Sequence, residues 1–385
     1  MTRPAKSLRI VCLAGCDWTA SWQPTQEIMT RLAEQGHQIL YIDPTGTRTV
    51  RLREWRRVWH RLKAKWFHSY PQTAYRGYGL QEEVLRIQHH PNITLYHPLL
   101  FPWPLSRVWT ILNRHLLMRR IRRWLAGAQA DVLWAWFPSP LNADLKRALQ
   151  HRISIFQIMS SIQTVRPHAA IREAEREMLD QYELIFVNSA TLQKQVSHPD
   201  TYLFRAGVDT VLFNPYEAHW VGRYSKERPA DLPTGKPIIM YVGSLHEWFD
   251  RPLWERLKRH LPDYHCVLIT GKPHPLLPLY VFYADVCVIP YRADAYTATS
   301  FPAKLNEYLA MGKPVVATRT AELEAFELLH GIRLGLSRTL DDWIDNILAA
   351  MASPDQSAHF RQIALGYDYT TQIQQMLALI HEQHP

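Results

Sequence analysis

The sequence predicts an α/β protein of two domains, each with a parallel sheet flanked by helices. Short apolar runs typical of buried strands alternate along the chain with longer amphipathic patterns typical of helices. The 385 residues exceed what one ordinary core accommodates and suit two domains. A polar stretch at residues 216–236 separates two such series and is interpreted as the interdomain linker.

Residues 1–215 contain the first series of alternating runs. Residues 8–14 predict a strand, and residues 25–35 predict an amphipathic helix that ends at Gly36, a residue that adopts φ > 0 without strain. Residues 167–182 predict a helix with a solvated face, because Glu and Arg recur at i,i+3 and i,i+4. Further strands are predicted at 38–42, 131–136, 153–158 and 184–187.

Residues 237–365 contain the second series and predict the C-terminal domain. Its strands are expected at 238–242, 266–270, 286–289 and 315–318, and helices at 252–259 and 303–311. A helix at 370–382 lies in a C-terminal segment, residues 366–385, that we expect to pack back on the N-terminal domain. Both domains are expected to be Rossmann-like, with ligands at the carboxyl ends of their strands and the two edges facing across a cleft.

The composition indicates a folded protein with an anionic partner. An apolar fraction of 47% and a charged fraction of 21% exclude a disordered chain. The net charge of +9 favours nucleic acid, an anionic membrane or a phosphorylated substrate as partner. Four cysteines lie in or beside apolar runs and are expected to be reduced: Cys12, Cys16, Cys266 and Cys287. No second ligand pair accompanies Cys12 and Cys16, so no zinc site is expected.

The N-terminal apolar run predicts neither a signal peptide nor a membrane span. Residues 8–14 are too few for a signal peptide and are followed by Cys-Asp-Trp rather than a cleavage site of small residues. No apolar run approaches the ~18–20 residues that cross a bilayer. We therefore expect a cytoplasmic protein that can lie peripherally on the inner face of the cell membrane.

Two basic stretches rich in Trp, residues 48–67 and 108–125, suit the surface of an anionic leaflet. Solvated helix faces with Trp in the core would produce the same pattern, and this alternative stays open. Nucleic-acid contact is disfavoured because no recognisable nucleic-acid motif accompanies the charge. The predicted membrane-contact residues are Arg53, Trp55, Arg56, Arg57, Trp59, Arg119, Arg120 and Arg123.

Residues 299–318 read TSFPAKLNEYLAMGKPVVAT and carry the most informative pattern. Thr299 or Ser300 can cap a helix, and Pro302 suits its first turn. The start of such a helix is a natural seat for phosphate, and Lys304 adds a cation there. Glu307, one turn later, can accept hydrogen bonds from two vicinal hydroxyls, such as those of a ribose. On spacing alone, Lys304 and Glu307 could equally be a surface ion pair.

This stretch resembles the donor-site motif of GT-B glycosyltransferases, in particular the group 1 family of bacterial polysaccharide and lipid glycosyltransferases. The matching residues are Pro302, Lys304, Glu307, Tyr308, Leu309, Ala310, Gly312, Lys313, Pro314, Val315 and Val316. Residues 22–36, 41–44, 207–213, 239–250 and 284–291 also resemble segments of this family. The resemblance implies a GT-B fold and a nucleotide-sugar site in the C-terminal domain, with the acceptor on the N-terminal side.

The reaction implied by this resemblance is transfer of a hexosyl group from a UDP- or GDP-sugar to a glycan or lipid-linked acceptor, in exopolysaccharide or cell-surface glycan synthesis. No cofactor is implied. The sequence contains no Asp-x-Asp, so fixed charges rather than a metal would stabilise the diphosphate. The expected donor-binding residues are Gly243, Ser244, His246, Arg292, Thr299, Ser300, Lys304, Leu305 and Glu307. An inverting enzyme also needs a general base, for which Asp17 is the candidate, although a loop or cap role would equally explain it.

Departures from the family pattern leave two alternatives. Thr299 stands where retaining members often carry Glu, and Ala206 stands where Asn is common. A catalytically inactive GT-B homologue that acts as a binding or partner subunit would tolerate these changes. A GT-B sugar-nucleotide epimerase is the second alternative, and it would convert the donor without any acceptor.

Overall fold

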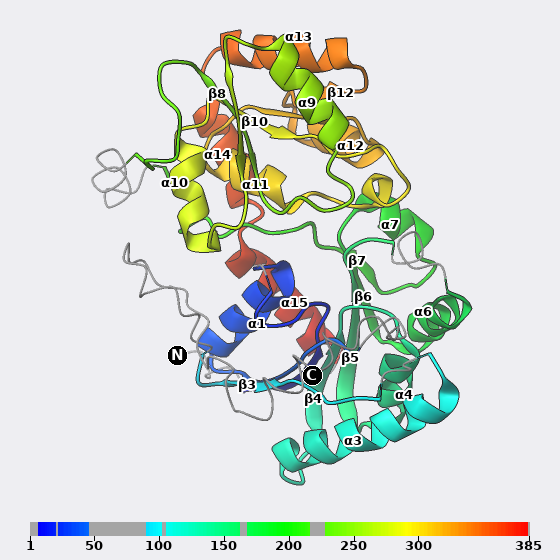
Figure 1. Ribbon diagram of the computed structural model, residues 1–385. Helices are drawn as coiled ribbons and strands as arrows, with labels where there is room; N and C mark the ends of the chain where they lie inside the picture. The colour runs from blue at the N-terminus through cyan, green and yellow to red at the C-terminus, as the bar shows by residue number, and fades with distance from the viewer. Residues whose placement is uncertain are drawn as a thin grey trace. The chain divides into compact units, whose positions relative to one another are not determined.

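The chain forms two compact α/β units. The computed structural model describes residues 7–20, 22–45, 90–101, 105–161, 168–215 and 228–383. Unit 1 comprises Met1–Val187, Val196–Tyr202 and Met376–Pro385, and unit 2 comprises Asn188–Gln195 and Leu203–Gln375. Each unit contains one sheet with helices on its faces, which confirms the predicted fold class (Figure 1).

The sheet of unit 1 has the strand order β3-β2-β1-β4-β5-β6-β7. β1 pairs in parallel with β2 on one side and β4 on the other, so the order reverses direction between β1 and β4. The apolar strands predicted from sequence agree with the structure to within two residues, whereas β3 and β7 were not predicted. The strands are β1 (Arg9–Leu13), β2 (Gln38–Ile42), β3 (Ile93–Tyr96), β4 (Ala130–Ala135), β5 (His151–Ile158), β6 (Leu184–Val187) and β7 (Thr201–Leu203).

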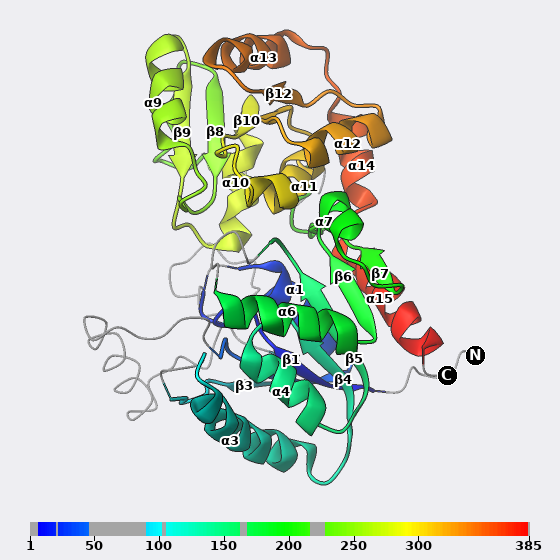
Figure 2. The ribbon, with the colours of Figure 1, turned by 90° about the vertical axis from the view of Figure 1, so that its right-hand side faces the viewer.

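Helices cover both faces of this sheet, as right-handed crossovers require when the strand order reverses. α1 (Pro24–Glu34) joins β1 to β2, and Gly36 just beyond it has φ +93, as its place after the helix predicted. On the other face lie α3 (Arg107–Leu125), α4 (Pro140–Ala148) and α6 (Ala169–Gln181), of which α4 contacts both of the others (Figure 2).

The sheet of unit 2 has the order β12-β11-β10-β8-β9, so its direction reverses between β8 and β10. Its strands are β8 (Ile238–Val242), β9 (His265–Ile269), β10 (Val286–Ile289), β11 (Val315–Thr318) and β12 (Gly335–Ser337). The larger helices are α9 (Arg251–His260), α10 (Leu277–Phe282), α11 (Ala303–Ala310), α12 (Ala321–His330), α13 (Leu340–Ala352) and α14 (Ser357–Leu365). The 3₁₀ turns are η3 (His274–Leu276) and η4 (Thr297–Thr299).

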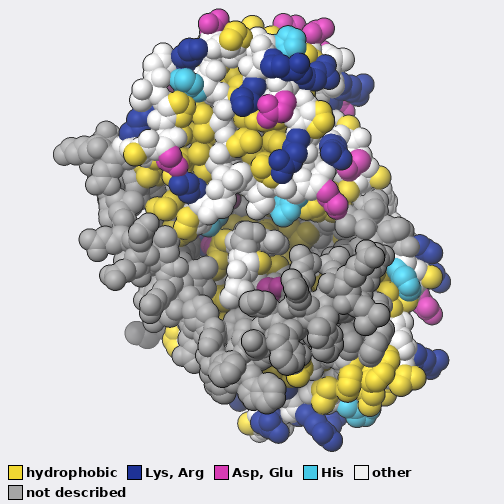
Figure 3. Space-filling view, in the orientation of Figure 1, with side chains coloured by type: hydrophobic (Ala, Val, Ile, Leu, Met, Phe, Trp, Pro, Cys, Tyr) yellow, Lys and Arg dark blue, Asp and Glu magenta, His cyan; other side chains and the backbone are white. Residues whose placement is uncertain are grey.

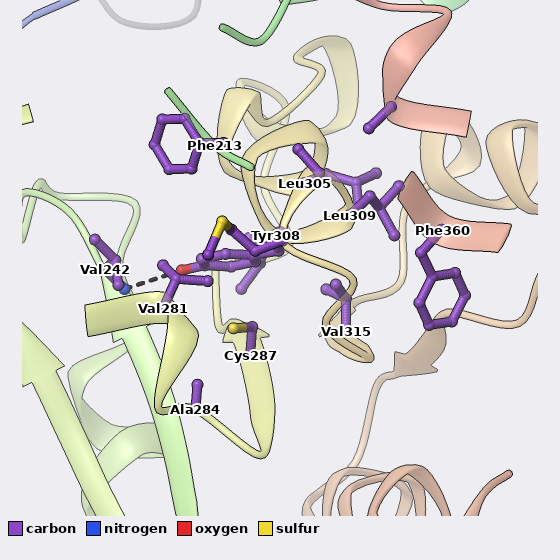
Figure 4. Close-up of a cluster of buried hydrophobic side chains, with 14 of the residues drawn as sticks. Phe213, Val242, Val281, Ala284, Cys287, Leu305, Tyr308, Leu309, Val315 and Phe360 are labelled. Atoms are coloured by element: carbon purple, nitrogen blue, oxygen red, sulfur yellow. Dashed lines mark hydrogen bonds between the residues drawn. The ribbon is translucent and has the colours of Figure 1, made fainter. Parts of the chain in front are cut away.

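Alternate residues of β8 point into two apolar clusters on opposite faces of this sheet. Met240 and Val242 pack with α10, α11 and α14, whereas Ile239 and Tyr241 pack with α9 and α13. Both faces of the strand are therefore buried, which is why it reads as a continuous apolar run in the sequence. Figure 4 shows the first cluster, in which Tyr308 of α11 lies between β8 and β10.

The unit boundary differs from the predicted one at residue 215. Residues 188–195, which include α7 (Ala190–Gln195), and residues 203–215 belong to unit 2. Ser189 Oγ donates to the Thr299 carbonyl at 2.7 Å, and Asn188 Nδ2 donates to the Phe301 carbonyl at 3.1 Å. α15 (Tyr369–Glu382) begins in unit 2 and ends in unit 1.

Unit 2 contains a buried ion pair between two segments distant in the sequence. Arg205 Nε donates to Glu322 Oε1 at 2.7 Å, and the two side chains are 7% and 0% exposed. The Arg205 guanidinium also lies over the rings of Phe301 and Phe326. Breaking such a pair is costly because the remaining charge stays buried without a counter-ion.

We predict that Arg205→Ala lowers the free energy of unfolding by about 3–5 kcal/mol, because Glu322 would keep its charge in the core. Urea unfolding followed by circular dichroism measures the change. Arg319→Ala is the matched control: Arg319 forms a comparable pair with Glu324, but both side chains are more than 40% exposed. This control should change stability little. Equal effects of the two substitutions would contradict the burial argument.

Candidate functional site

The candidate site lies at the carboxyl edge of the unit 2 sheet, where the strand order reverses. Gly243 is the first residue after β8, and Tyr291 is the second residue after β10. In open α/β sheets, adjacent loops leave the sheet in opposite directions at such a point and open a crevice for ligands. The predicted donor residues after β8 and β10 meet here because these two strands are neighbours in the sheet.

Tyr308 fixes α11 against β8. The last register pairs between β8 and β10 are Ile239 with Val286 and Met240 with Cys287, so the N–H of Val242 lies beyond this ladder. That N–H donates to the Tyr308 hydroxyl at 2.9 Å, and the Tyr308 side chain is fully buried (Figure 4). The bond satisfies a buried backbone donor and sets the position of α11 along the strand.

Lys304, in the first turn of α11, lies directly against the backbone of Gly243. A Cβ built on Gly243 would be 2.1 Å from Lys304 Cε and 2.6 Å from Nζ, so no side chain fits at this position. Gly243 also has φ +138, a conformation that favours glycine. The glycine therefore both turns the chain after β8 and leaves room for the ammonium group at the sheet edge.

The surroundings of Lys304 favour its charged form. Burial disfavours the ammonium, but Tyr291 and Glu307 both favour it, and the pKa of Lys304 lies above its usual value. Its Nζ also lies 5.6 Å from the centre of the Tyr241 ring. Burial of the His246 side chain lowers its pKa, and the positive charge of Lys304 lowers it further. The imidazole is therefore neutral at pH 7. A positive charge is thus held at this edge.

Glu307 lies one turn after Lys304 and is oriented by a histidine that the sequence analysis did not identify. His274 Nε2 lies 3.2 Å from Glu307 Oε1, and both side chains are about four-fifths buried. The His274 ring also contacts Phe213, with ring centres 5.5 Å apart. No sequence signal marks His274, because it lies in a proline-rich turn far from the motif.

The loops after β8 and β10 form an aromatic wall beside these charges. Trp248 stacks on Tyr296 with ring centres 4.9 Å apart, and His246 contacts the Trp248 ring at 4.4 Å. The Arg292 backbone N–H donates to the Trp248 carbonyl at 2.7 Å, while its side chain is exposed. Aromatic faces of this kind suit a planar base or a sugar ring.

Two predicted roles at the start of α11 need correction, the capping roles of Thr299 and Ser300. Pro302 is the N-cap residue, so neither Thr299 nor Ser300 caps the helix. Both hydroxyls instead donate to the Tyr296 carbonyl, at 3.0 and 2.9 Å, because η4 turns the chain just before α11. Leu305 is completely buried, so its side chain belongs to the core, and its contact with a donor stays a prediction.

A small pocket opens beside the start of α11. Its lining comes from the ends of β10 and β11, η4 and the first turn of α12, and includes Tyr291, Tyr296, Ser300, Pro302 and Thr320. A larger cavity lies at the opposite, amino edge of the same sheet, beside α13 and α14, and includes neither Lys304 nor Glu307 in its lining. The charged groups and the aromatic wall therefore gather at the carboxyl edge.

Asp17, the predicted general base, lies in the loop after β1 at the carboxyl edge of unit 1. Its carbonyl accepts from the Ala20 N–H at 2.9 Å, and its side chain is half-buried. Two titratable residues that the sequence analysis missed lie at the same edge. Asp43 and His97 follow β2 and β3, and their side chains are hydrogen-bonded. β3 itself was not predicted, so the sequence offered no reason to place His97 beside Asp43.

The predicted membrane-contact residues divide into two groups. Arg53, Trp55, Arg56, Arg57 and Trp59 lie outside the described residues. In α3, Arg119 and Arg123 are exposed, whereas Arg120 is half-buried over the Tyr96 ring and does not share their face. Trp124 also points inward, since its Nε1 donates to Thr94 Oγ1 at 3.1 Å.

The exposed face of α3 is apolar in its first half. Val108, Ile111, Leu112 and Leu116 are 64%, 38%, 42% and 39% exposed, at the i, i+3, i+4 and i+8 spacing of one helix face. Figure 3 shows apolar side chains gathered at this place, at the lower right. The buried face carries Leu117, Ile121 and Leu125.

The described part of the chain contains no helix long and apolar enough to cross a membrane. The same residues contain no group of three or more His, Cys, Asp or Glu side chains placed to hold a metal ion. The four cysteines are all free, as predicted.

Comparison with known proteins finds a match in the C-terminal half of the chain. Residues 239–353 match the family model "Glycosyl transferases group 1". A stretch of 53 residues is 43% identical to the teichuronic acid biosynthesis glycosyltransferase TuaH of Bacillus subtilis (strain 168). That stretch covers 14% of this chain and 13% of TuaH.

Solved structures of glycosyltransferases share the fold over nearly the whole chain. Sucrose-phosphate synthase from Thermosynechococcus elongatus superposes with a TM-score of 0.62 at 17% identity, covering 98% of this chain and 96% of the enzyme. HepE of Anabaena, solved with UDP and glucose, gives a TM-score of 0.63 at 13% identity, covering 97% and 99%. The α,α-trehalose-phosphate synthase (UDP-forming) of Burkholderia vietnamiensis gives 0.64 at 12% identity, covering 98% of each chain. The fold is therefore that of the GT-B glycosyltransferases.

We predict that Gly243→Ala lowers the free energy of unfolding by about 2–4 kcal/mol, because the new methyl group meets Lys304 and the backbone is strained. In a Lys304→Ala background the contact with the lysine is absent. Gly243→Ala should then lower the free energy of unfolding only through the strained backbone, by about 1–3 kcal/mol. A double-mutant cycle by urea unfolding measures the difference.

Gly271→Ala is the control, since Gly271 also has positive φ (+68) but a Cβ there would meet nothing within 4 Å. Its cost should not depend on Lys304. A cycle that shows no coupling between positions 243 and 304 would contradict the close approach described above.

Proposed function

We propose that this chain is a glycosyltransferase that moves a sugar from a nucleotide-sugar donor to a glycan or lipid-linked acceptor. The observation that carries the proposal is the charged Lys304 held against the bare backbone of Gly243, at the strand-order reversal of a group 1 domain. A diphosphate is the ligand that this arrangement favours, because it combines a fixed cation, a helix start and a backbone that can be approached closely.

The donor is proposed to be a UDP- or GDP-sugar. Lys304 and the first-turn N–H groups of α11 would bind the diphosphate and stabilise the charge that develops on it as the sugar leaves. Glu307, oriented by His274, would accept hydrogen bonds from the ribose hydroxyls. Trp248 and Tyr296 offer the aromatic surface beside them. HepE, which shares the fold, was solved with UDP and with UDP-glucose, which supports a uridine nucleotide as the first probe.

The pathway is proposed to be exopolysaccharide or cell-surface glycan synthesis. The partial match to TuaH, a protein named for teichuronic acid biosynthesis, supports this class of acceptor. We propose that the diphosphate is held by fixed charges and that transfer needs no metal ion or other cofactor. A reaction that continues in excess EDTA is the expected result.

We further propose that the chain works peripherally on the inner face of the cell membrane, with α3 as the contact. The exposed face of α3 combines an apolar first half with Arg119, Arg122 and Arg123 in its second half, and the helix contains no acidic residue. An anionic leaflet fits both parts, since apolar side chains enter the interface and each Arg contributes roughly 1 kcal/mol near the surface. A membrane surface would also bring the enzyme to a lipid-linked acceptor.

We predict that Lys304→Ala and Glu307→Gln each weaken UDP or GDP binding by about 10- to 100-fold, as loss of a charge-assisted hydrogen bond implies. Isothermal titration calorimetry on the full chain measures the affinity. Lys258→Ala, at an exposed lysine on α9, is the matched control and should bind as the native chain does. A native chain that binds no nucleotide, or Lys304 and Glu307 variants with native affinity, would overturn the proposed donor site. Conversion of the donor sugar without any acceptor would instead identify an epimerase.

We predict that replacing both Ile111 and Leu112 with Asp reduces binding to vesicles containing phosphatidylglycerol at least tenfold, since two side chains lose their burial in the interface. Co-sedimentation measures the bound fraction. Leu328→Asp is the control, because Leu328 is an 87% exposed leucine on α12 in unit 2. Native binding should also weaken with salt and on vesicles of phosphatidylcholine alone. A bound fraction that none of these changes affects would rule out α3 as the contact.

A further inference from the structure

The small pocket beside the start of α11 is lined almost entirely by apolar surface. Ile289 ends β10, Thr318 ends β11 and Leu323 lies in α12, and all three residues are buried. The cavity has a volume of about 30 Å³, which is room for about two water-sized groups. It can therefore take a methyl group or the end of an acetyl group, but no ring.

The hydroxyl groups around this pocket already have partners in the backbone. Thr297 Oγ1, Ser300 Oγ and Thr318 Oγ1 each donate to a backbone carbonyl oxygen. Thr320 Oγ1 caps α12 and accepts a hydrogen bond from the Leu323 N–H at 3.3 Å. Because the hydroxyl protons of the first three residues point to the backbone, the side chains present mainly carbon atoms to the space between them.

A pocket of this kind favours an apolar group over a water molecule or a hydroxyl. A buried water needs about two to four polar partners, and burying a hydroxyl without replacing its bonds to water is unfavourable. A methyl group loses no hydrogen bond and is stabilised by leaving water. The lining therefore distinguishes a methyl-ended substituent from a hydroxyl of similar size.

Two residues connect the pocket with the charged group at the start of α11. Tyr291 lines the pocket, and its side chain is hydrogen-bonded to Lys304. Pro302 also lines the pocket, and as the N-cap residue of α11 it lies two residues before Lys304. A sugar bonded to a diphosphate at this helix start would therefore have the pocket within its reach.

We propose that this pocket receives a methyl-ended substituent of the donor sugar and selects nucleotide sugars that carry one; this inference rests on the donor site proposed above. The methyl group ends the acetamido group of an N-acetylhexosamine or stands at C6 of a 6-deoxyhexose. A hexose with hydroxyls at both positions brings a polar group to a lining that offers it no donor, so it binds more weakly.

Calorimetry on the full chain with UDP-glucose, UDP-N-acetylglucosamine and UDP-6-deoxyglucose tests the inference. Relative to UDP-glucose, the second compound places a methyl group at the end of its C2 acetamido group, and the third places one at C6. We expect one of these two to bind at least about tenfold more tightly than UDP-glucose, as a single apolar group in a fitted pocket allows. The compound that does so identifies which substituent enters the pocket.

Leu323→Phe tests the pocket itself, because the larger side chain fills the space. The preferred donor should then bind no more tightly than UDP-glucose, while UDP alone binds with native affinity because it carries no sugar. Leu334→Phe is the matched control: Leu334 is also 2% exposed, but it lies just before β12 at the opposite edge of the sheet. This control should keep the donor preference. The comparison of donors on the native chain is informative whether or not the variants fold.

Two results would overturn the inference. The first is equal affinity of the native chain for all three UDP-sugars, and the second is a donor preference that survives in a folded Leu323→Phe variant. A native chain that binds UDP but shows no preference leaves the proposed donor site standing and removes only the pocket's role. A native chain that binds no nucleotide removes both proposals.

Discussion

The close approach of Lys304 to Gly243 is the contact on which the candidate site depends. A half-buried ammonium is tolerated only where nearby groups favour its charge, and Tyr291 and Glu307 supply that support. The contact in turn requires a residue without a side chain after β8, and it requires a fixed position of α11 along that strand. The hydrogen bond from the Val242 N–H to the Tyr308 hydroxyl fixes this position. Packing, hydrogen bonding and electrostatics thus converge on one lysine.

Both units gather polar residues at the carboxyl edge of their sheet in the same way. Each sheet reverses its strand order, between β1 and β4 in unit 1 and between β8 and β10 in unit 2. Polar residues just after the strands then collect at the carboxyl edge. In unit 2 they are a cation and a carboxylate, which suit a charged nucleotide. In unit 1 they are a carboxylate and an imidazole, the hydrogen-bonded side chains of Asp43 and His97.

Periodicity in the sequence predicted the buried strands well because a strand buried on both faces is apolar throughout. β8, β10 and β11 were placed at their observed bounds for this reason. β3 was missed because only part of it is buried, and its short run resembles a loop. The unit boundary was misplaced because the segment around Gly207 packs against Tyr369, far away in the sequence. A local pattern cannot reveal such a contact.

Taken alone, the sequence specified the α/β class, the two strand series and the motif that carries Lys304 and Glu307, since these depend on the order of residue types along the chain. The tertiary structure decided which residues meet. It paired Glu307 with His274, set Lys304 against Gly243, joined Asp43 to His97 and exposed one face of α3 while turning Arg120 inward. Each of these contacts joins residues whose separation along the chain carries no signal, because strand order and helix packing bring them together.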